Sequence, residues 1–363
     1  MPFDSGSISF RVFHLDHEFD SAIVDSFARH AVPPLETLLS EPLTGWVSSR
    51  HLLDRNLTEE KILHAGYVNL QLLRAEKKIP EALLRAHCRL EEEAERKARD
   101  IEILPRALRA EIKERVRDEL LPTMPPTLTG MPVCVDLRNQ LLLASCMSDA
   151  KIDLLFAQFR ETTGVTPRLM TPDDTALRRV RVNVNDLAAA RYSPDDSIED
   201  EHELSIGMDF LTWLWFSWER DGGLFKHGNL QYGYMLEGPL TFFRDGAGAH
   251  EAVLRHGSPL NSNEAFAALL CGKKLRRAKF ILAEGNALWT ATLDSDFAIR
   301  SLKLPKTEQL DPVGRFQERM IFIERFLDAF LSLYDRFLLL RADRKKWSTE
   351  LTSIRDWIFA KAK

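Results

Sequence analysis

The strongest hydrophobic pattern lies near the C-terminal end of the chain, where eight positions recur at alternating spacings of four and three residues. These positions are Phe316, Met320, Ile323, Leu327, Phe330, Tyr334, Phe337 and Arg341. Such spacing is typical of a long helix that buries one face. A second helix is predicted from Trp347 to Ala360. The pattern leaves open whether the pair packs on the body of its own chain or on another copy of it.

A second helical pattern runs through a highly charged stretch, 80–121. Its first part repeats through Leu83, His87, Leu90, Ala94, Ala98 and Ile101, and its second part through Leu104, Leu108, Ile112, Val116 and Leu120. Pro105 separates two helices, because the residue before a proline disfavours helical geometry. Charges of both signs fill the other positions, so the pair makes a poor core for itself. We therefore expect a protruding helical arm.

Shorter alternating patterns predict β-strands on both sides of this arm. Strands are expected at 8–12 and 67–73 before it, and a hairpin at 133–145 with a helix over 149–162 after it. Later strands are expected at 240–243, 252–255, 276–282, 288–293 and 299–304, around a helix over 262–270 that Ser262 caps. This order of elements predicts an α+β fold with an elongated protomer and mixed or antiparallel sheets.

The predicted elements divide the chain into five parts. They are 1–73, the first part of a central α+β domain; 74–170, the arm with the hairpin and its helix; 171–237, a middle part; 238–305, the second part of the central domain; and 306–363, a C-terminal helical region. Within the middle part, 195–203 carries six acids and no base and is interpreted as a solvated linker. The stretch 204–218 holds three tryptophans and is interpreted as a buried core helix with Phe210, Leu211 and Leu214 inward.

The composition is that of an ordinary folded protein, with 363 residues, 45% hydrophobic and 28% charged. Lys plus Arg is 49 and Asp plus Glu is 54, so the formal net charge is −5. This charge argues against a protein that coats DNA through bulk attraction. A local basic surface stays open, because the field at a site depends on where the charges lie.

The cysteines and the apolar runs bear on the cellular compartment. The four cysteines form no CxxC pair, so no zinc ribbon is indicated. Cys134 and Cys146 could face each other across the hairpin, but cytosolic disulfides are rare and reduced thiols are expected. The chain opens without a recognisable signal peptide, and its longest apolar run, 210–218, is about half of a membrane span. A cytoplasmic protein is therefore expected.

A search for catalytic motifs finds none complete. Gly272-Lys273 lacks both the first glycine and the hydroxyl of a phosphate-binding loop. Pro172-Asp173 resembles part of a restriction-type nuclease site, but the nearby Glu111-Ile112-Lys113 lies upstream on a helix. His14 and His17 would point to opposite faces of a strand. We therefore predict no enzymatic activity, no catalytic residues, no metal site and no cofactor, with a metal-dependent nuclease as an alternative.

Three runs of cations point to chemistry of another kind. They are Lys273, Lys274, Arg276, Arg277 and Lys279; then Arg178, Arg179 and Arg181; and then Arg344, Lys345 and Lys346. Rows of cations suit phosphate contacts, which supply sequence-independent affinity for nucleic acid. We predict that the first run contacts DNA, with the second run as a further candidate. Simple strand alternation would send Arg277 and Lys279 to one face and Arg276 to the other.

Several strings in collinear order resemble the RdgC family of bacterial recombination-associated proteins. The strings are Gly45-Trp46-Val47, Lys78-Ile79-Pro80, the stretch 113–122, Cys134-Val135-Asp136 with Asn139-Gln140-Leu141, Ser262 to Lys274, Arg300 to Leu304, and Arg315-Phe316. The resemblance covers nearly the whole chain. It is interrupted by a middle, at about 177–257, that is enlarged relative to the family.

The resemblance implies a ring-shaped homodimer with a positively charged central hole. Such a ring would bind DNA, double-stranded and also single-stranded, without sequence preference, and would modulate RecA-dependent recombination and replication at the nucleoid. RecA is thereby a possible partner, and no membrane is implied. Dimer contacts are expected at Pro125, where the family often has an aromatic residue, and at Phe316, Ile323 and Phe330 of the C-terminal helix. A protein-interaction scaffold without DNA binding is the other alternative to this reading.

Overall fold

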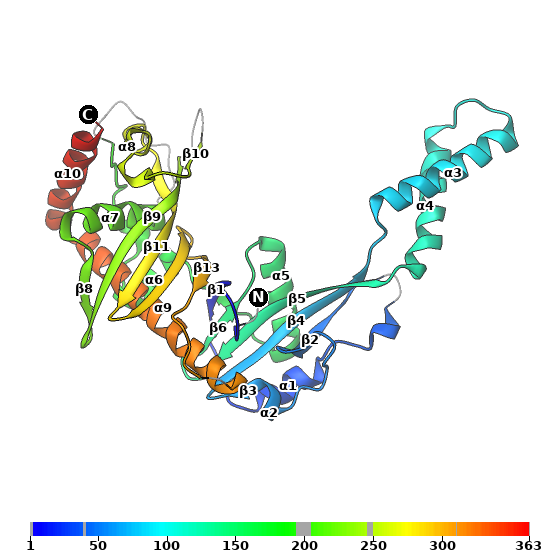
Figure 1. Ribbon diagram of the computed structural model, residues 1–363, viewed down its shortest axis with the longest axis horizontal. Helices are drawn as coiled ribbons and strands as arrows, with labels where there is room; N and C mark the ends of the chain where they lie inside the picture. Colours follow the sequence, from blue (N-terminus) through cyan, green and yellow to red (C-terminus); the bar gives the residue numbers. More distant parts are fainter. Residues whose placement is uncertain (1–2, 39–40, 194–204, 245–249, 310, 363) are drawn as a thin grey trace. The chain divides into compact units, whose positions relative to one another are not determined.

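The computed structural model describes residues 3–38, 41–193, 205–244, 250–309 and 311–362 (Figure 1). Helices and antiparallel strands alternate along the chain, so the predicted α+β fold is confirmed. Contacts divide the chain into two compact units. Unit 1 is Met1–His17, Arg138–Asp153 and Pro167–Lys363, and unit 2 is Glu18–Leu137 and Leu154–Thr166. The predicted acidic linker, 195–203, lies outside the described residues.

Unit 1 contains an antiparallel sheet with the strand order β10-β9-β11-β12-β13-β1-β6; β8 pairs with β9, and β7 pairs with β1. Its strands are β1 (Ile8–His14), β6 (Leu141–Ala144), β7 (Arg168–Leu169), β8 (Leu224–His227), β9 (Leu230–Phe243), β10 (Glu251–Leu254), β11 (Lys274–Glu284), β12 (Ala287–Asp294) and β13 (Ile299–Lys303). The strands predicted between 240 and 304 are present. The sequence did not predict β8 or the first part of β9, because the residues there mix glycine and aromatic side chains without clear alternation.

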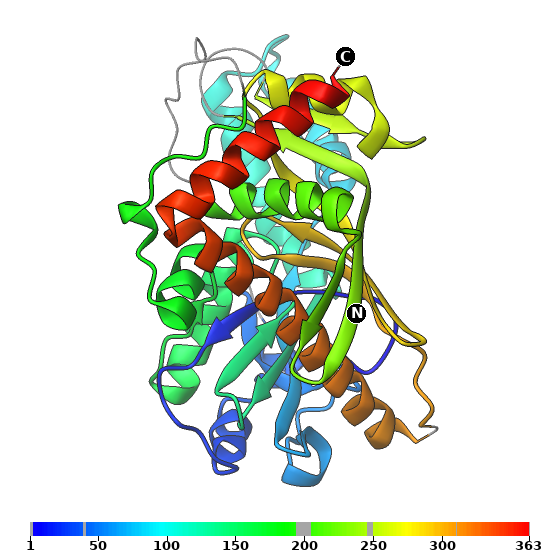
Figure 2. The same ribbon diagram turned by 90° about the vertical axis from the view of Figure 1, so that its left-hand side faces the viewer.

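The helices of unit 1 form a layer on one side of this sheet. They are α6 (Pro172–Val180), α7 (Ile206–Asp221), α8 (Asn263–Leu270), α9 (Pro312–Ala342) and α10 (Arg344–Lys361), with short turns η3 (Val184–Asp186) and η4 (Pro259–Asn261). Figure 2 shows α7, α9 and α10 in front of the strands. The helix α5 (Asp149–Thr163) spans the boundary between the units.

Aromatic side chains join the helix layer to the sheet. The ring of Phe280 on β11 lies 6.1 Å from that of Phe326 on α9, and Trp289 on β12 lies 6.0 Å from Phe322. Phe210 on α7 lies 5.0 Å from Tyr334 of α9. All eight positions of the predicted C-terminal stripe are buried, so α9 packs on the body of its own chain. The interpretation of the tryptophan-rich stretch as a core helix is likewise confirmed.

Unit 2 is a smaller sheet with helices around it. Its strands are β2 (Leu43–Ser48), β3 (Leu63–His64), β4 (Tyr67–Lys77) and β5 (Pro126–Asp136), and its helical elements are α1 (Ile23–Arg29), η1 (Leu35–Thr37), α2 (Glu59–Ile62), α3 (Glu81–Arg99), α4 (Arg106–Leu120) and η2 (Leu121–Thr123). β4 pairs with β5 along its whole length and with β2 on its other edge. In the core, the rings of Phe27 and Trp46 meet edge to face at 4.9 Å. The Trp46 indole donates a hydrogen bond of 2.7 Å to the Thr162 hydroxyl.

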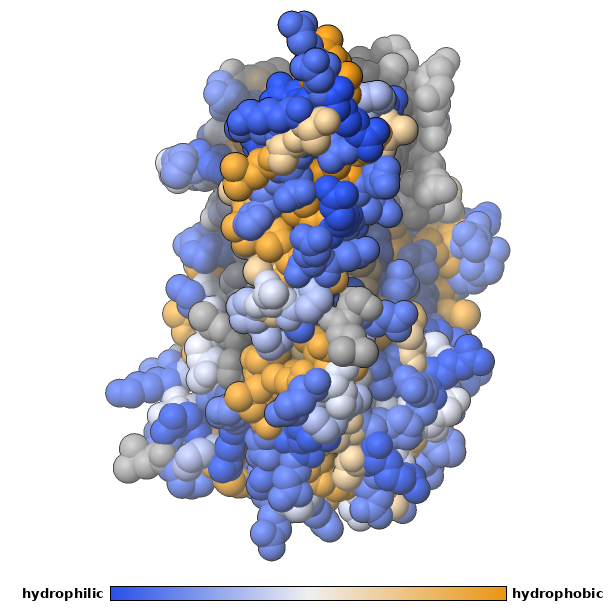
Figure 3. All heavy atoms as spheres, turned by 90° about the vertical axis from the view of Figure 1, so that its right-hand side faces the viewer, coloured by the Kyte–Doolittle hydropathy of each residue, from blue (hydrophilic) through white to orange (hydrophobic). Residues whose placement is uncertain are grey.

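The predicted arm is the antiparallel helix pair α3 and α4, carried at the ends of β4 and β5 (Figure 1). It has a small core of its own, made by Leu84, Leu104, Ile112 and Val116. The stripe predicted on α4 is confirmed. The stripe predicted on α3 is wrong, because Leu90 is 64% exposed whereas Leu84 is buried. Figure 3 faces the arm and shows a mainly hydrophilic surface that apolar side chains interrupt.

The arm core makes a prediction about local stability. Ile112→Ala removes a fully buried side chain from a core of few residues, and such substitutions cost about 2–5 kcal/mol. We expect amide hydrogen exchange to accelerate strongly across α3 and α4 while unit 1 keeps its protection. Leu90→Ala, at an exposed position on the same arm, is the matched control and should leave hydrogen exchange unchanged in both the arm and unit 1. Equal exchange in both variants would show that these four side chains do not hold the arm together.

Candidate nucleic-acid interface

The first run of cations is divided between the two sides of β11. Leu275, Ala278 and Phe280 are buried towards the helix layer, while Arg277 and Lys279 take the other side. The buried positions 275 and 278 are three residues apart, and the pairing register with β9 shifts at the same place. A bulge therefore inserts one extra residue here. The simple alternation predicted for Arg276 is wrong for this reason, since Arg276 is exposed beside Arg277.

Neighbouring strands add further charges to the same side of the sheet. Lys279 lies opposite Thr292 of β12, which in turn lies opposite Arg300 of β13; Lys303, also on β13, lies opposite Thr290. We call this surface the open face. Its charged members are the cations Arg276, Arg277, Lys279, Arg300 and Lys303 and the carboxylates Glu237, Glu251 and Asp294. Among the described residues, ion pairs join four of these cations to the three carboxylates, and a fourth acid close enough to act on Arg277, Asp296, pairs with Arg11 of β1.

Carboxylates hold most of these cations in place. Asp294, which is buried, accepts hydrogen bonds from both Arg277 and Arg300. The bond to Asp294 raises the pKa of the Arg277 guanidinium, which stays charged. Lys279 lies 2.5 Å from Glu237 on β9. Such pairs fix the positions of flexible side chains on a rigid sheet, and each cation keeps donors that a further anion can use.

Two members of the first run lie apart from the open face. The Lys274 ammonium is 2.7 Å from the carboxylate of Asp209 on α7, and the two side chains are only 15% and 1% exposed. The Arg341 guanidinium approaches the same carboxylate at 3.9 Å. Lys274 therefore neutralises a buried acid in the core. Lys273 precedes β11 and is half-buried.

The second and third runs belong to the helix layer. Arg178 on α6 pairs with Asp16 and Asp174, at 2.8 and 3.0 Å. Arg179 donates two hydrogen bonds to the carboxylate of Asp335, at 2.8 and 2.6 Å, and this bidentate contact links α6 to α9. Arg181 ends α6 in the left-handed region and is exposed. Arg344, Lys345 and Lys346 form the exposed first turn of α10. The structure therefore does not gather the three runs on one surface.

A further group of cations, missed at the sequence level, surrounds a cavity of about 340 Å³ at the base of the arm. Lys77, Lys78, Lys113 and Arg117 line it, with Glu81 as the one acid among the lining residues. The Lys77 ammonium donates to the Pro122 carbonyl at 2.8 Å, and Lys78 pairs with Glu76. Lys77 and Lys78 precede α3 and Lys113 and Arg117 lie on α4, so the pairing of β4 with β5 and the packing of α3 on α4 bring them together.

Residues 9–204 match the family model described as "Putative exonuclease, RdgC". The match spans more than half of the chain. This chain belongs to the RdgC family. Membership indicates a DNA-binding protein related to recombination, at that general level. The matched segment includes the arm and α6, whereas β11 and the rest of the open face follow it. No curated protein matches the chain.

Of the four residues expected at dimer contacts, one is exposed in the protomer and three are buried. Pro125 is exposed, between η2 and β5. Phe316, Ile323 and Phe330 have exposures of 2%, 0% and 2%, because they form part of the core between α9 and the rest of unit 1. In the protomer these three side chains are therefore not on the surface, and α9 could meet a second copy only through its outer face.

The name of the family includes an exonuclease, and nucleases of this kind use acidic residues to hold a metal ion. Asp173 lies in the first turn of α6, and Glu111-Ile112-Lys113 lies on α4 of unit 2. His14 lies 3.6 Å from Asp174, and burial lowers the pKa of its imidazole. Within the described residues there is no group of three His, Cys, Asp or Glu side chains placed to hold a metal ion. In the same part of the chain, no helix is both long and apolar enough to span a membrane.

The adjacent lysines 273 and 274 allow a sharp test of the division between core and surface. Lys274→Met leaves the buried Asp209 with Arg341, at 3.9 Å, as its remaining ion-pair partner among the described residues, and breaking a buried pair costs about 3–5 kcal/mol. Lys273→Met removes the same charge at the next position and should stay within about 0.5 kcal/mol of the parent. Urea unfolding of both variants measures the difference. Equal stability of the two would mean that the Asp209 pair is not part of the core.

Proposed function

We propose that this RdgC-family protein binds DNA without sequence preference through the open face of unit 1. The observation that carries the proposal is the placement of Arg276, Arg277, Lys279, Arg300 and Lys303 on the side of the sheet opposite the helix layer. Cations of this kind bind phosphates, which have the same charge at every base step. Sequence readout needs a helix or a two-stranded ribbon that enters a groove, and this face is a broad sheet.

The acids on the open face give the interface a particular character. DNA phosphates would compete with Asp294 and Glu237 for the same guanidinium and ammonium groups. The free energy gained from each phosphate contact is therefore partly offset by the loss of a contact with a carboxylate. The affinity should therefore be moderate and strongly dependent on salt. Because the carboxylates already order the side chains, little rotamer entropy is lost when DNA binds.

The proposal includes an assembly and a cellular role, which membership of the RdgC family supports. The functional form is a ring-like homodimer that encloses DNA, acts at the nucleoid and modulates RecA-dependent recombination and replication. Pro125 is one exposed position at which a second copy would be met. The protein acts by binding and has no catalytic step. A net charge of −5 is compatible with this, since acids elsewhere would keep the outside of a ring from coating DNA.

A charge-matched pair of variants tests the interface. In Arg276→Gln/Arg277→Gln/Lys279→Gln, a duplex of random sequence should bind at least tenfold more weakly at low salt. The slope of log affinity against log salt should fall by about two to three, because each phosphate contact contributes about 0.9. The control, Arg344→Gln/Lys345→Gln/Lys346→Gln, loses the same charge from α10. Fluorescence anisotropy across a salt series measures both slopes.

The opposite change should strengthen binding. Asp294→Asn removes the carboxylate shared by Arg277 and Arg300 and keeps the size of the side chain. We expect several-fold tighter binding of duplex DNA at low salt and a steeper salt dependence. Weaker binding by this folded variant would argue against contact between DNA and these two arginines.

The oligomeric state is tested by mass measurement in solution. A homodimer has twice the chain mass of 41.6 kDa. Pro125→Asp should shift the equilibrium towards the single chain if this exposed position lies in the contact. A stable dimer that does not bind DNA at low salt would instead favour a protein-interaction scaffold.

The family description makes nuclease activity the second candidate function. It would appear as magnesium-dependent DNA degradation that persists through repeated purification and disappears in Asp173→Ala. We expect no degradation by the purified protein. Persistent activity that this substitution abolishes would replace the binding proposal with an enzymatic one.

A further inference from the structure

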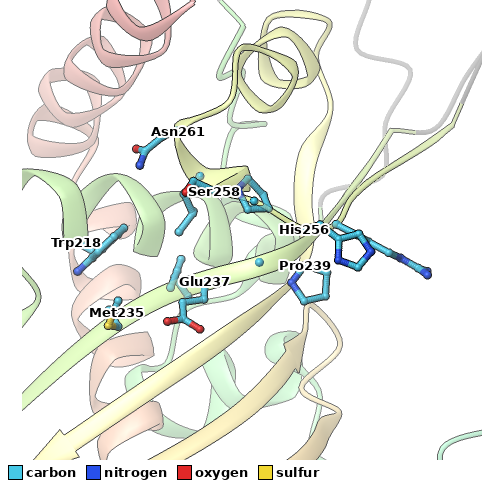
Figure 4. A pocket seen from close by; sticks show the side chains of 13 residues that line it. Trp218, Met235, Glu237, Pro239, His256, Ser258 and Asn261 are labelled. Carbon is cyan, nitrogen blue, oxygen red and sulfur yellow. The ribbon is translucent and has the colours of Figure 1, made fainter.

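A cavity of about 610 Å³ lies at the edge of the unit 1 sheet, beside the middle of β9. Its walls come from α7, β9 and the segment that leads into η4. Figure 4 shows the side chains that line it, among them Trp218, Met235, Glu237, His256, Ser258 and Asn261. The volume is in the usual range for small-molecule sites, about 300–1,000 Å³.

Trp218 differs from the other six tryptophans of the chain. Each of those six has a ring contact or an indole hydrogen bond to another residue. Trp218 is half-buried and, within the described residues, has neither. Gly223, in the turn that follows α7, packs against this ring so closely that a Cβ there would lie 2.7 Å from the indole Cδ1. One wall of the cavity is therefore a positioned aromatic ring without a partner.

Polar groups line the rest of the cavity. The side chains of Arg255, Ser258 and Asn261 make no hydrogen bond to any described residue. On the outer edge of β9, β8 pairs with 230–233 and β10 with 240–243, so 235–239 has no partner strand on that edge. Gly238 lets η4 pack directly on β9, since a Cβ there would lie 2.5 Å from Pro259. The cavity is thus preformed and offers donors and acceptors around a flat apolar surface.

The shape of this edge argues against a peptide as the ligand. An extended peptide could pair only with 235–239, because β8 and β10 close the edge at both ends. Pro239 has no N–H to offer in that short stretch. A compact planar group with polar edges fits better. Glu237 lines the cavity and also pairs with Lys279, so the site adjoins the open face.

We propose that this cavity binds an unpaired nucleobase of single-stranded DNA, stacked on Trp218 with its polar edge towards Asn261 and Ser258. Arg255, an exposed cation among the lining residues, is the group that would meet a phosphate beside the base. The inference rests on the proposed function and extends it, because a duplex that keeps its bases stacked cannot fill the site. Stacking tolerates every base, since each has a π-face, so the site preserves binding without sequence preference.

The test compares three probes on the full chain: a 20-nucleotide oligo(dT), an abasic strand of the same length, and a duplex. Wild type should bind oligo(dT) more tightly than the abasic strand, which has the same charge. Trp218→Ala should weaken oligo(dT) binding by about 5- to 150-fold, the usual range for one stacked base, with abasic and duplex binding unchanged. Trp218→Phe should restore most of the loss.

Two further variants keep the outcome interpretable. Phe359→Ala removes an exposed aromatic side chain of α10, outside the cavity, and should have no effect. Asn261→Ala changes an exposed side chain and should weaken oligo(dT) binding alone, even if Trp218→Ala fails to fold.

Equal binding of oligo(dT) and the abasic strand by wild type would overturn the base site while leaving the open face intact. An equal loss on all three probes in Trp218→Ala and Asn261→Ala would overturn it as well. Failure of wild type to bind any of the three probes would overturn the proposed function and the base site together.

Discussion

The packing of two aromatic helices on one side of an antiparallel sheet is the constraint on which the rest of unit 1 depends. α9 buries its rings against Phe280 and Trp289, and α7 buries Trp215 against Phe242 of β9, so the residues of β11, β12 and β13 that face these helices are apolar. The alternate residues are then turned to the other side, where charge costs little. The open face is therefore a consequence of where the core lies, and its rigidity comes from the same rings.

That constraint gives adjacent cations opposite roles. Lys274 and Lys279 belong to one short run, yet Lys274 serves a buried carboxylate in the core while Lys279 faces outward beside Glu237. A count of charges along the chain does not separate these cases, and neither does a net charge of −5. Sidedness relative to the core decides which cations can reach a phosphate. The tryptophan-rich middle follows the same rule, since its inward rings build the core and Trp218 lines a cavity at the sheet edge.

Periodicity predicted most of the helices and several strands, because burial of one face leaves a regular trace in the sequence. The stripe of α9 is correct in every position. The wrong predictions have local causes. A bulge in β11 turns Arg276 to the face opposite the predicted one, and the narrow contact of α3 with α4 buries Leu84 and leaves Leu90 exposed. The candidate site was only partly predictable. Arg300 and Lys303 lie on the open face because β13 pairs with β12. Arg179 is paired with Asp335 of α9, a residue far away in the sequence, so no local pattern could have predicted that contact.

If DNA lies on the open face, it should cover the lysines there, and lysine footprinting measures this. Acetylation of surface lysines, with and without a random duplex at low salt, reports which ammonium groups the DNA covers. We predict protection of Lys279 and Lys303, with no change at Lys345 and Lys346, which are exposed on α10. Protection of Lys345 and Lys346 with Lys279 and Lys303 unchanged would contradict it.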